Sequence, residues 1–184
     1  MMRFVFYSAA QPMPEAMAAQ LLSLMREAFP PAERRTEDEF RQLFTHPNVQ
    51  ILCARQDERL QGFLLLWVLD GFVFVENFAV QSDLRGQGLG SDLLRVLTGH
   101  FGLPVILEVE PPEDDLTRRR VAFYERNGYH LNACEYYLPC LSDEIERSVQ
   151  LQIMSAPEPL SEAACRAAID VLYRSVYEGK PIRK

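Results

Sequence analysis

The chain has 184 residues, of which 48% are hydrophobic and 24% are charged, a composition typical of one globular domain and not of a disordered chain. Its formal net charge of −7 gives nucleic-acid binding little electrostatic support. No stretch approaches the roughly 18 consecutive apolar residues of a membrane-spanning helix, and the N-terminus lacks the apolar segment of a secretory leader. We therefore expect a cytoplasmic protein without a membrane partner.

The cysteines give no sign of a metal site. Cys53, Cys134, Cys140 and Cys165 have no Cys-x-x-Cys spacing, and the three histidines do not cluster with them. We expect no metal, and we expect reduced thiols in place of a disulfide framework.

The first part of the chain predicts a strand, two helices and three antiparallel strands. Residues 3–8 are rich in β-forming side chains, and apolar side chains recur at helical spacing after Pro14. Thr36 and Glu39 have the spacing of a capping box, which predicts a short helix that Pro47 ends. Three apolar runs, separated by short polar turns, then predict strands at residues 49–55, 60–69 and 72–80.

A glycine-rich stretch follows the last of these strands. Residues 85–91 read Arg-Gly-Gln-Gly-Leu-Gly-Ser, and apolar side chains at helical spacing follow them. Glycine lets main-chain N–H groups approach an anion, and the first turn of a helix adds unpaired donors and a positive dipole end. The stretch therefore indicates a site for phosphate or pyrophosphate. It lacks the Gly-Lys-Ser/Thr of a P-loop and the glycine spacing of the dinucleotide fingerprint.

The rest of the chain predicts a strand, a helix, two strands and a final helix, at about residues 105–109, 117–127, 129–138, 149–154 and 161–178. The strand, helix and strand around the glycine-rich stretch predict a parallel strand pair. We expect a main domain over residues 1–155. Residues 156–184 would form a helical extension that packs on the same domain or on a partner, which leaves a homodimer open.

A second motif gives the chain a family resemblance. Residues 123–129 read Phe-Tyr-Glu-Arg-Asn-Gly-Tyr, and with the Arg-x-x-Gly-x-Gly of residues 85–90 they resemble the GNAT N-acetyltransferase superfamily. The resemblance extends over residues 3–154. It implies an α/β (α+β) fold, in which a mixed, mostly antiparallel sheet of about six or seven strands has flanking helices and a splayed parallel strand pair. The C-terminal helix would be an addition to that fold.

The resemblance also implies a site for acetyl-coenzyme A. The pantetheine arm would bond to the main chain of one strand, as a neighbouring strand would, and the pyrophosphate would meet the glycine-rich stretch. Seven residues before the tyrosine of the second motif, the family often has an asparagine that contacts the cofactor; this chain has Thr117 there. The cofactor-binding residues implied in this way are Phe78, Ala79, Val80, Arg85, Gly86, Gln87, Gly88, Leu89, Gly90, Ser91 and Thr117.

Acetyl transfer to an amine needs a base and an acid. An ammonium has no lone pair, so a positioned carboxylate is expected to supply the neutral amine. Glu76 is the first candidate, because it interrupts an apolar strand where some family members place a base; its alternative role is to orient the acceptor. Glu108 and Glu110 are rivals. Tyr124 matches the tyrosine that protonates the departing thiolate in the family.

The expected function is therefore acetyl-coenzyme A-dependent N-acetylation of a small-molecule or protein amine, by direct attack in a ternary complex. Two alternatives stay open. One is a non-catalytic acyl-coenzyme A sensor or interaction module, and the other is a nucleotide-binding α/β domain. The sequence carries no recognisable code for the acceptor.

Overall fold

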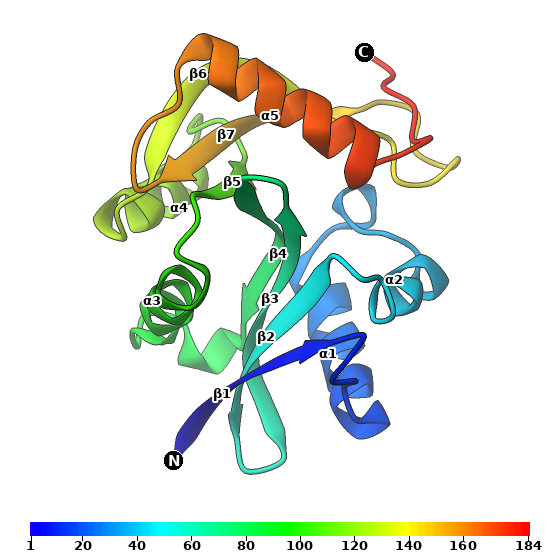
Figure 1. Ribbon diagram of the computed structural model, residues 1–184, viewed down its shortest axis with the longest axis vertical. Helices are drawn as coiled ribbons and strands as arrows, with labels where there is room; N and C mark the ends of the chain where they lie inside the picture. The colour runs from blue at the N-terminus through cyan, green and yellow to red at the C-terminus, as the bar shows by residue number, and fades with distance from the viewer. The chain divides into compact units, whose positions relative to one another are not determined.

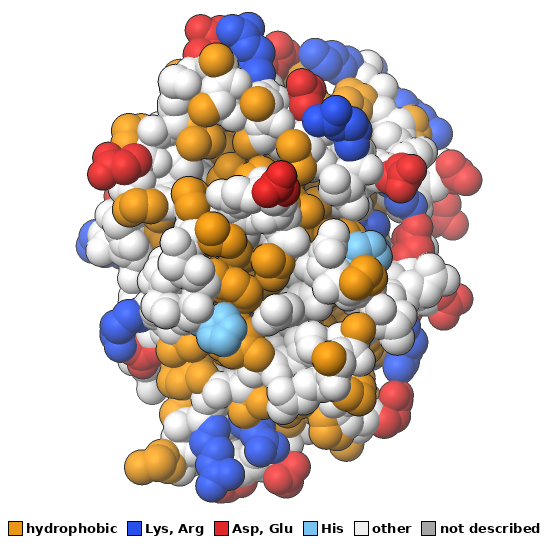
Figure 2. All heavy atoms as spheres, viewed as in Figure 1, with side chains coloured by type: hydrophobic (Ala, Val, Ile, Leu, Met, Phe, Trp, Pro, Cys, Tyr) orange, Lys and Arg blue, Asp and Glu red, His pale blue; other side chains and the backbone are white. Residues whose placement is uncertain are grey.

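The computed structural model describes residues 1–184, with the side chain of Ala32 left out of the description. The chain divides into two compact units, Met1–Leu103 and Pro104–Lys184, whose elements are drawn in Figure 1. Among the described residues, no helix is both long enough and apolar enough to cross a membrane. Figure 2 shows acidic and basic side chains mainly around the edge of the visible face, with hydrophobic side chains toward its middle.

The first unit contains a four-stranded antiparallel sheet. Its strands are ordered β1-β2-β3-β4 and comprise β1 (Met2–Ser8), β2 (Val49–Gln56), β3 (Arg59–Leu69) and β4 (Phe72–Val80). The β3–β4 turn contains Gly71 at φ 89°, a left-handed conformation that glycine adopts without steric cost. The three consecutive antiparallel strands predicted from the sequence are confirmed.

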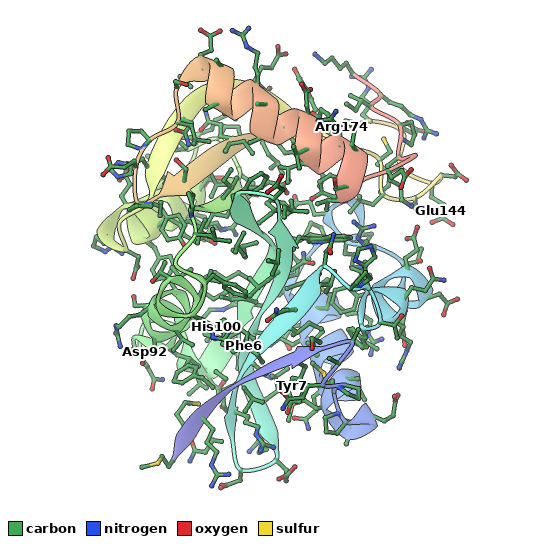
Figure 3. The ribbon with its side chains drawn as sticks, in the orientation of Figure 1. Phe6, Tyr7, Asp92, His100, Glu144 and Arg174 are labelled. Atoms are coloured by element: carbon green, nitrogen blue, oxygen red, sulfur yellow. A yellow bond between two sulfur atoms is a disulfide. The ribbon has the colours of Figure 1, made fainter. Side chains whose placement is uncertain are left out.

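Helices cover this sheet on both faces. Figure 1 shows α1 (Glu15–Ala28) and α3 (Leu89–Phe101) on opposite faces, and each packs on β3 and β4. The short helix α2 (Glu37–Leu43) begins with the predicted capping box, because Thr36 Oγ1 accepts from Glu39 N and the Glu39 carboxylate accepts from Thr36 N. Near the C-terminal end of α3, His100 stacks on Phe6 of β1 with ring centroids 4.0 Å apart (Figure 3).

The second unit contains a three-stranded antiparallel sheet and two helices. The strands β5 (Val105–Val109), β6 (His130–Leu138) and β7 (Val149–Ala156) have the order β5-β7-β6. The helix α4 (Asp115–Arg126) lies against β5 and β6, and α5 (Glu162–Ser175) packs on β6. The final helix is thus shorter than the expected 161–178, because the chain leaves the helix at Val176 and turns at Gly179, φ 74°.

The expectation of free thiols is wrong for two of the four cysteines. Cys134 on β6 and Cys165 on α5 form a disulfide with Cα atoms 6.5 Å apart, whereas Cys53 and Cys140 are free and buried. The pairing joins residues 31 positions apart, and only the packing of α5 on β6 brings them together. Disulfides persist in oxidising compartments and are rare in the cytosol. The pair therefore gives no support to the expected cytoplasmic location, which stays a prediction.

The C-terminal residues bind to the β6–β7 connection. Cys140 N donates to Pro181 O at 2.9 Å, and Ser148 N donates to Arg183 O at 2.8 Å. Lys180 Nζ donates to Leu141 O at 2.8 Å. The connection between β6 and β7 is therefore held by the end of the chain as well as by its own strands.

Candidate active site

The glycine-rich stretch forms an exposed loop that ends at the first turn of α3. Gly86 and Gly88 have φ angles of 75° and 90°, which L side chains rarely adopt. Gly88 is the N-cap of α3, and no side chain caps the helix there. The first bond into the helix runs from Asp92 N to Gly88 O at 3.1 Å, so the N–H groups of the first turn lack helical partners. The first turn of α3 thus has unpaired N–H groups beside two left-handed glycines, and anion binding there stays a prediction.

The loop is fixed to the end of β4 and to the short turn before it. Arg85 Nε donates to Val80 O at 3.3 Å, and Gln87 Nε2 donates to Asp83 O at 2.7 Å. A Cβ placed on Gly86 or Gly88 would meet no atom within 4 Å, so the space beside both residues is open. These contacts present the main-chain donors to solvent, where a phosphate can reach them.

Strand β4 is irregular at Glu76. Asn77 lies opposite Leu65 of β3, whereas Val75 lies opposite Leu66, which leaves Glu76 as the extra residue of a β-bulge. Bulges redirect side chains and are frequent beside active sites. Glu76 thus stands at a break in the ladder, two residues before Phe78, Ala79 and Val80 begin.

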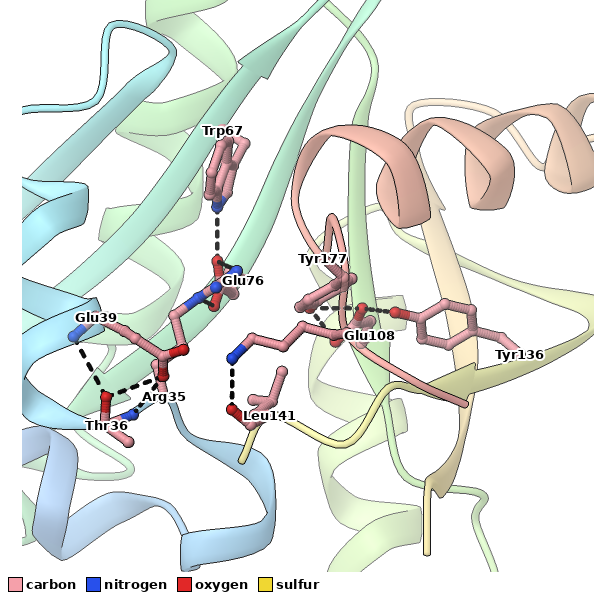
Figure 4. Close-up of polar contacts among 10 residues, drawn as sticks. Arg35, Thr36, Glu39, Trp67, Glu76, Glu108, Tyr136, Leu141 and Tyr177 are labelled. Atoms are coloured by element: carbon pink, nitrogen blue, oxygen red, sulfur yellow. Dashed lines mark hydrogen bonds and ion pairs between the residues drawn. The ribbon is translucent and has the colours of Figure 1, made fainter. Parts of the chain in front are cut away.

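The carboxylate of Glu76 is buried and held by two side chains (Figure 4). Arg35 Nε lies 2.7 Å from Oε1, Arg35 Nη2 lies 3.4 Å from Oε2, and Trp67 Nε1 donates to Oε2 at 2.6 Å. The Arg35 and Glu76 side chains are only 8% and 4% exposed. Both carboxylate oxygens therefore have donors, and Oε1, with one short bond from Arg35, keeps a lone pair for a further proton or hydrogen bond.

Arg35 and Trp67 were not identified from the sequence. Arg35 precedes the capping box of α2 and belongs to no motif, and Trp67 lies in a run of apolar residues that predicts only a buried strand. One signal could have indicated a partner for Trp67: the indole N–H of a buried tryptophan usually donates a hydrogen bond to some acceptor.

In the second unit, Tyr124 occupies the last turn of α4. Its side chain is 7% exposed, and its ring makes an edge contact with Tyr129 at 5.7 Å between centroids. Burial raises the pKa of the Tyr124 hydroxyl well above its usual value. The phenol is protonated at neutral pH, as a tyrosine with its usual pKa also is, and burial holds the proton more tightly.

Thr117 closes the N-terminus of α4. Its backbone N donates to Asp114 Oδ1 at 2.8 Å, and Asp114 N donates to Thr117 Oγ1 at 3.0 Å, which completes a capping box. The Thr117 hydroxyl also donates within this cap. The Thr117 hydroxyl thus already has partners within the protein. The role of Thr117 in cofactor binding stays a prediction.

The two rival carboxylates have different surroundings. Glu108 on β5 accepts hydrogen bonds from Tyr136 and from Tyr177, whose hydroxyl lies 3.1 and 3.3 Å from the two carboxylate oxygens (Figure 4). Glu110 forms an ion pair with Arg120 of α4. Two tyrosine hydroxyls thus donate to Glu108, and a guanidinium pairs with Glu110.

Comparison with known proteins places these features in one family. Residues 18–129 match the model of the acetyltransferase (GNAT) family. The acetyltransferase-like protein YjbC of Bacillus subtilis (strain 168) is 30% identical over 128 residues, which are 68% of this chain and 66% of that protein. The chain thus spans about two thirds of its curated relative.

Solved structures agree with the family match. An acetyltransferase-like GNAT protein from Bacteroides thetaiotaomicron has a TM-score of 0.83 and 27% identity, and the match covers 95% of this chain and 98% of that one. Arabidopsis thaliana NAA60 in complex with acetyl-CoA has a TM-score of 0.60 and 15% identity, over 84% of this chain and 97% of the other. The fold class expected from the sequence is confirmed.

Proposed function

Because the chain belongs to the GNAT acetyltransferase family, we propose that it transfers the acetyl group of acetyl-coenzyme A to an amine, by direct attack in a ternary complex. One observation carries this proposal. No side chain caps the N-terminus of α3, and Gly86 and Gly88, which lead into it, have left-handed conformations. This N-terminus lies directly after β4 and within the residues that match the family. The acceptor is a small-molecule amine or a protein amine.

The chain offers donors of the right kind for the cofactor. We assign the pyrophosphate to the loop and first helical turn at residues 85–91, and the pantetheine arm to the main chain of Phe78, Ala79 and Val80. The open space beside Gly86 and Gly88 fits this assignment. Thr117 fixes the first turn of α4 and is kept in the proposed set. When bound, acetyl-coenzyme A supplies an activated thioester.

The acid and the base are assigned by their protonation chemistry. Tyr124, whose hydroxyl is protonated at neutral pH, gives its proton to the departing thiolate. Glu76, which also binds Arg35 and Trp67, takes the proton of the attacking amine directly or through water. Glu108 is the rival base. The glutamine variants E76Q and E108Q separate the two, because only the variant that removes the base should lower turnover by about 10²-fold or more.

Calorimetric titration with acetyl-coenzyme A tests the function directly. We expect the titration to give one binding site per chain. In a separate assay with a panel of primary amines, we expect release of the free thiol of coenzyme A. A folded sample that binds no acetyl-coenzyme A would contradict the proposal.

Y124F tests the assigned acid. We expect turnover to fall by about 10²-fold, within the range for a positioned acid or base, while the Kd for acetyl-coenzyme A stays the same. Y7F, in the first unit, is the matched control and should turn over normally. Equal turnover of Y124F and the unchanged protein would remove Tyr124 from its role.

One observation favours a second function. Both oxygens of Glu76 are occupied by Arg35 and Trp67, an arrangement that suits a structural anchor better than a base. A non-catalytic acyl-coenzyme A sensor would show normal binding and no thiol release with any amine of the panel.

A further inference from the structure

Two asparagines of this chain are buried in sheets, and their surroundings differ. Asn132 on β6 is 4% exposed and has partners for both ends of its amide. Its Nδ2 donates to Ile153 O at 3.2 Å and to Ser155 Oγ at 3.0 Å, and its Oδ1 accepts from Leu160 N at 2.7 Å. Asn77 on β4 is 5% exposed, and its Oδ1 has no hydrogen-bond partner among the described residues.

The surroundings of Asn77 explain why its carbonyl lacks a donor. Directly opposite on β3 lies Leu65, and the next cross-strand pair on the same face is Phe63 with Ala79. Leu65 and Phe63 are fully buried and carry no polar side-chain atom. The neighbouring residue Glu76 takes the donors of Arg35 and Trp67.

A buried acceptor without a donor lowers stability, so its donor is to be sought outside the chain. Three other buried side-chain atoms of the described residues also lack partners, namely Arg55 Nε, Tyr129 Oη and Gln152 Oε1. Asn77 differs from these in its position. It follows the bulge at Glu76 and directly precedes Phe78, where the proposed pantetheine contacts begin.

We propose that the side-chain carbonyl of Asn77 is a binding point for an N–H donor of the substrate, and that this donor is an amide N–H of the pantetheine arm of coenzyme A. The inference rests on the proposed function. Two sources offer the same chemistry, because the acceptor amine also carries N–H groups. The pantetheine arm is favoured, since its amides would run along the strand that carries Asn77.

The test compares two ligands on one variant. In N77L the carbonyl is replaced by an apolar side chain of similar size. Calorimetry measures the Kd for coenzyme A and for adenosine 3′,5′-bisphosphate, which has two of the three phosphates of coenzyme A and no pantetheine. Losing one neutral hydrogen bond should weaken coenzyme A by about three- to tenfold. Binding of adenosine 3′,5′-bisphosphate should not change.

A stability measurement separates this role from a packing effect. N77L without ligand should melt at the same temperature as the unchanged protein or above it, because it removes an unpaired acceptor. N132L, the matched control, should melt lower, because it breaks bonds, and should bind coenzyme A normally. If N77L does not fold, N77A, which also lacks a side-chain acceptor, serves the same comparison.

The outcomes are distinguishable. If the unchanged protein binds no coenzyme A, the proposed function itself fails. If it binds coenzyme A and N77L binds equally well, the inference about Asn77 is overturned. It is also overturned if N77L keeps its affinity for coenzyme A but loses thiol release with spermidine, lysine and an alanyl peptide, since the donor is then the acceptor amine.

Discussion

At the scale of single residues, the pair formed by Arg35 and Glu76 has the largest expected energetic effect. Both side chains are almost completely buried, so each ion depends on the other for the interactions that water would otherwise supply. The pair joins the segment before α2 to the bulge of β4. It therefore fixes the position of Glu76, whatever the role of the carboxylate in the reaction.

We predict that R35M lowers the free energy of unfolding by about 3–5 kcal/mol, because it leaves the Glu76 carboxylate buried without its cation. Urea denaturation measures the loss. The control is R41M, whose ion pairs with Glu15 and Glu37 are exposed and should add little stability. Equal midpoints for R35M and the unchanged protein would show that the buried pair adds no stability.

Sequence reasoning at this scale identified the atypical residue but not its partners. Glu76 is prominent as a carboxylate in an apolar strand. Arg35 lies 41 positions earlier, and no local pattern connects the two. The empty acceptor of Asn77 is equally invisible in the sequence, because an asparagine in a strand looks the same whether its amide is bonded or not.

At the scale of elements, the two ends of α3 offer a matched pair of glycines. Gly88 at the N-cap and Gly102 at the C-cap have φ angles of 90° and 62°, and an added Cβ would meet no atom within 4 Å at either position. Alanine at either position therefore introduces backbone strain without a collision. Only the N-terminal end carries the proposed phosphate donors.

We predict that G88A and G102A each lower the free energy of unfolding by about 1–2 kcal/mol, the cost of a left-handed conformation in a residue with a Cβ. G88A alone should weaken coenzyme A, by about tenfold, because the helix N-terminus contributes on the order of 1–2 kcal/mol to a bound anion. Calorimetry on both variants checks this. If G102A weakens binding as much as G88A, the effect comes from general destabilisation.

The disulfide between β6 and α5 gives the second prediction at this scale. Its loop of 31 residues should contribute about 3–4 kcal/mol to the stability of the oxidised chain. Reduction should therefore lower the urea midpoint of the unchanged protein, and a C134A/C165A variant should not respond to reductant. Identical midpoints with and without reductant in the unchanged protein would contradict the prediction.

The element scale also shows where sequence reasoning is strongest. The capping box at Thr36 and the glycines of the loop act through residues within four positions of each other, so their geometry follows from the local sequence. The disulfide was missed because its cysteines meet only after α5 has packed on β6. Local chemistry was thus predictable, and chemistry that depends on tertiary packing was not.

At the scale of the whole molecule, the order of helices and strands follows from the sequence, but the order of strands in space follows only in part. Short polar turns predict that β2, β3 and β4 pair as neighbours, and they do. In the second unit, β7 lies between β5 and β6. A long connection between β6 and β7 leaves the pairing to side-chain packing, which the sequence pattern does not specify.

The whole-molecule consequence of the proposed function is a stability that depends on the cofactor. A ligand that binds only the folded chain stabilises it by about 2.7 kcal/mol at a free concentration of 100 times Kd. For a chain of 184 residues, this corresponds to a rise in Tm of about 5–10 °C. Thermal unfolding with acetyl-coenzyme A should show this rise, and G88A at the same ligand concentration should show a smaller one. An unchanged Tm at a concentration that saturates the calorimetric titration would mean that the unfolded chain binds the ligand as well.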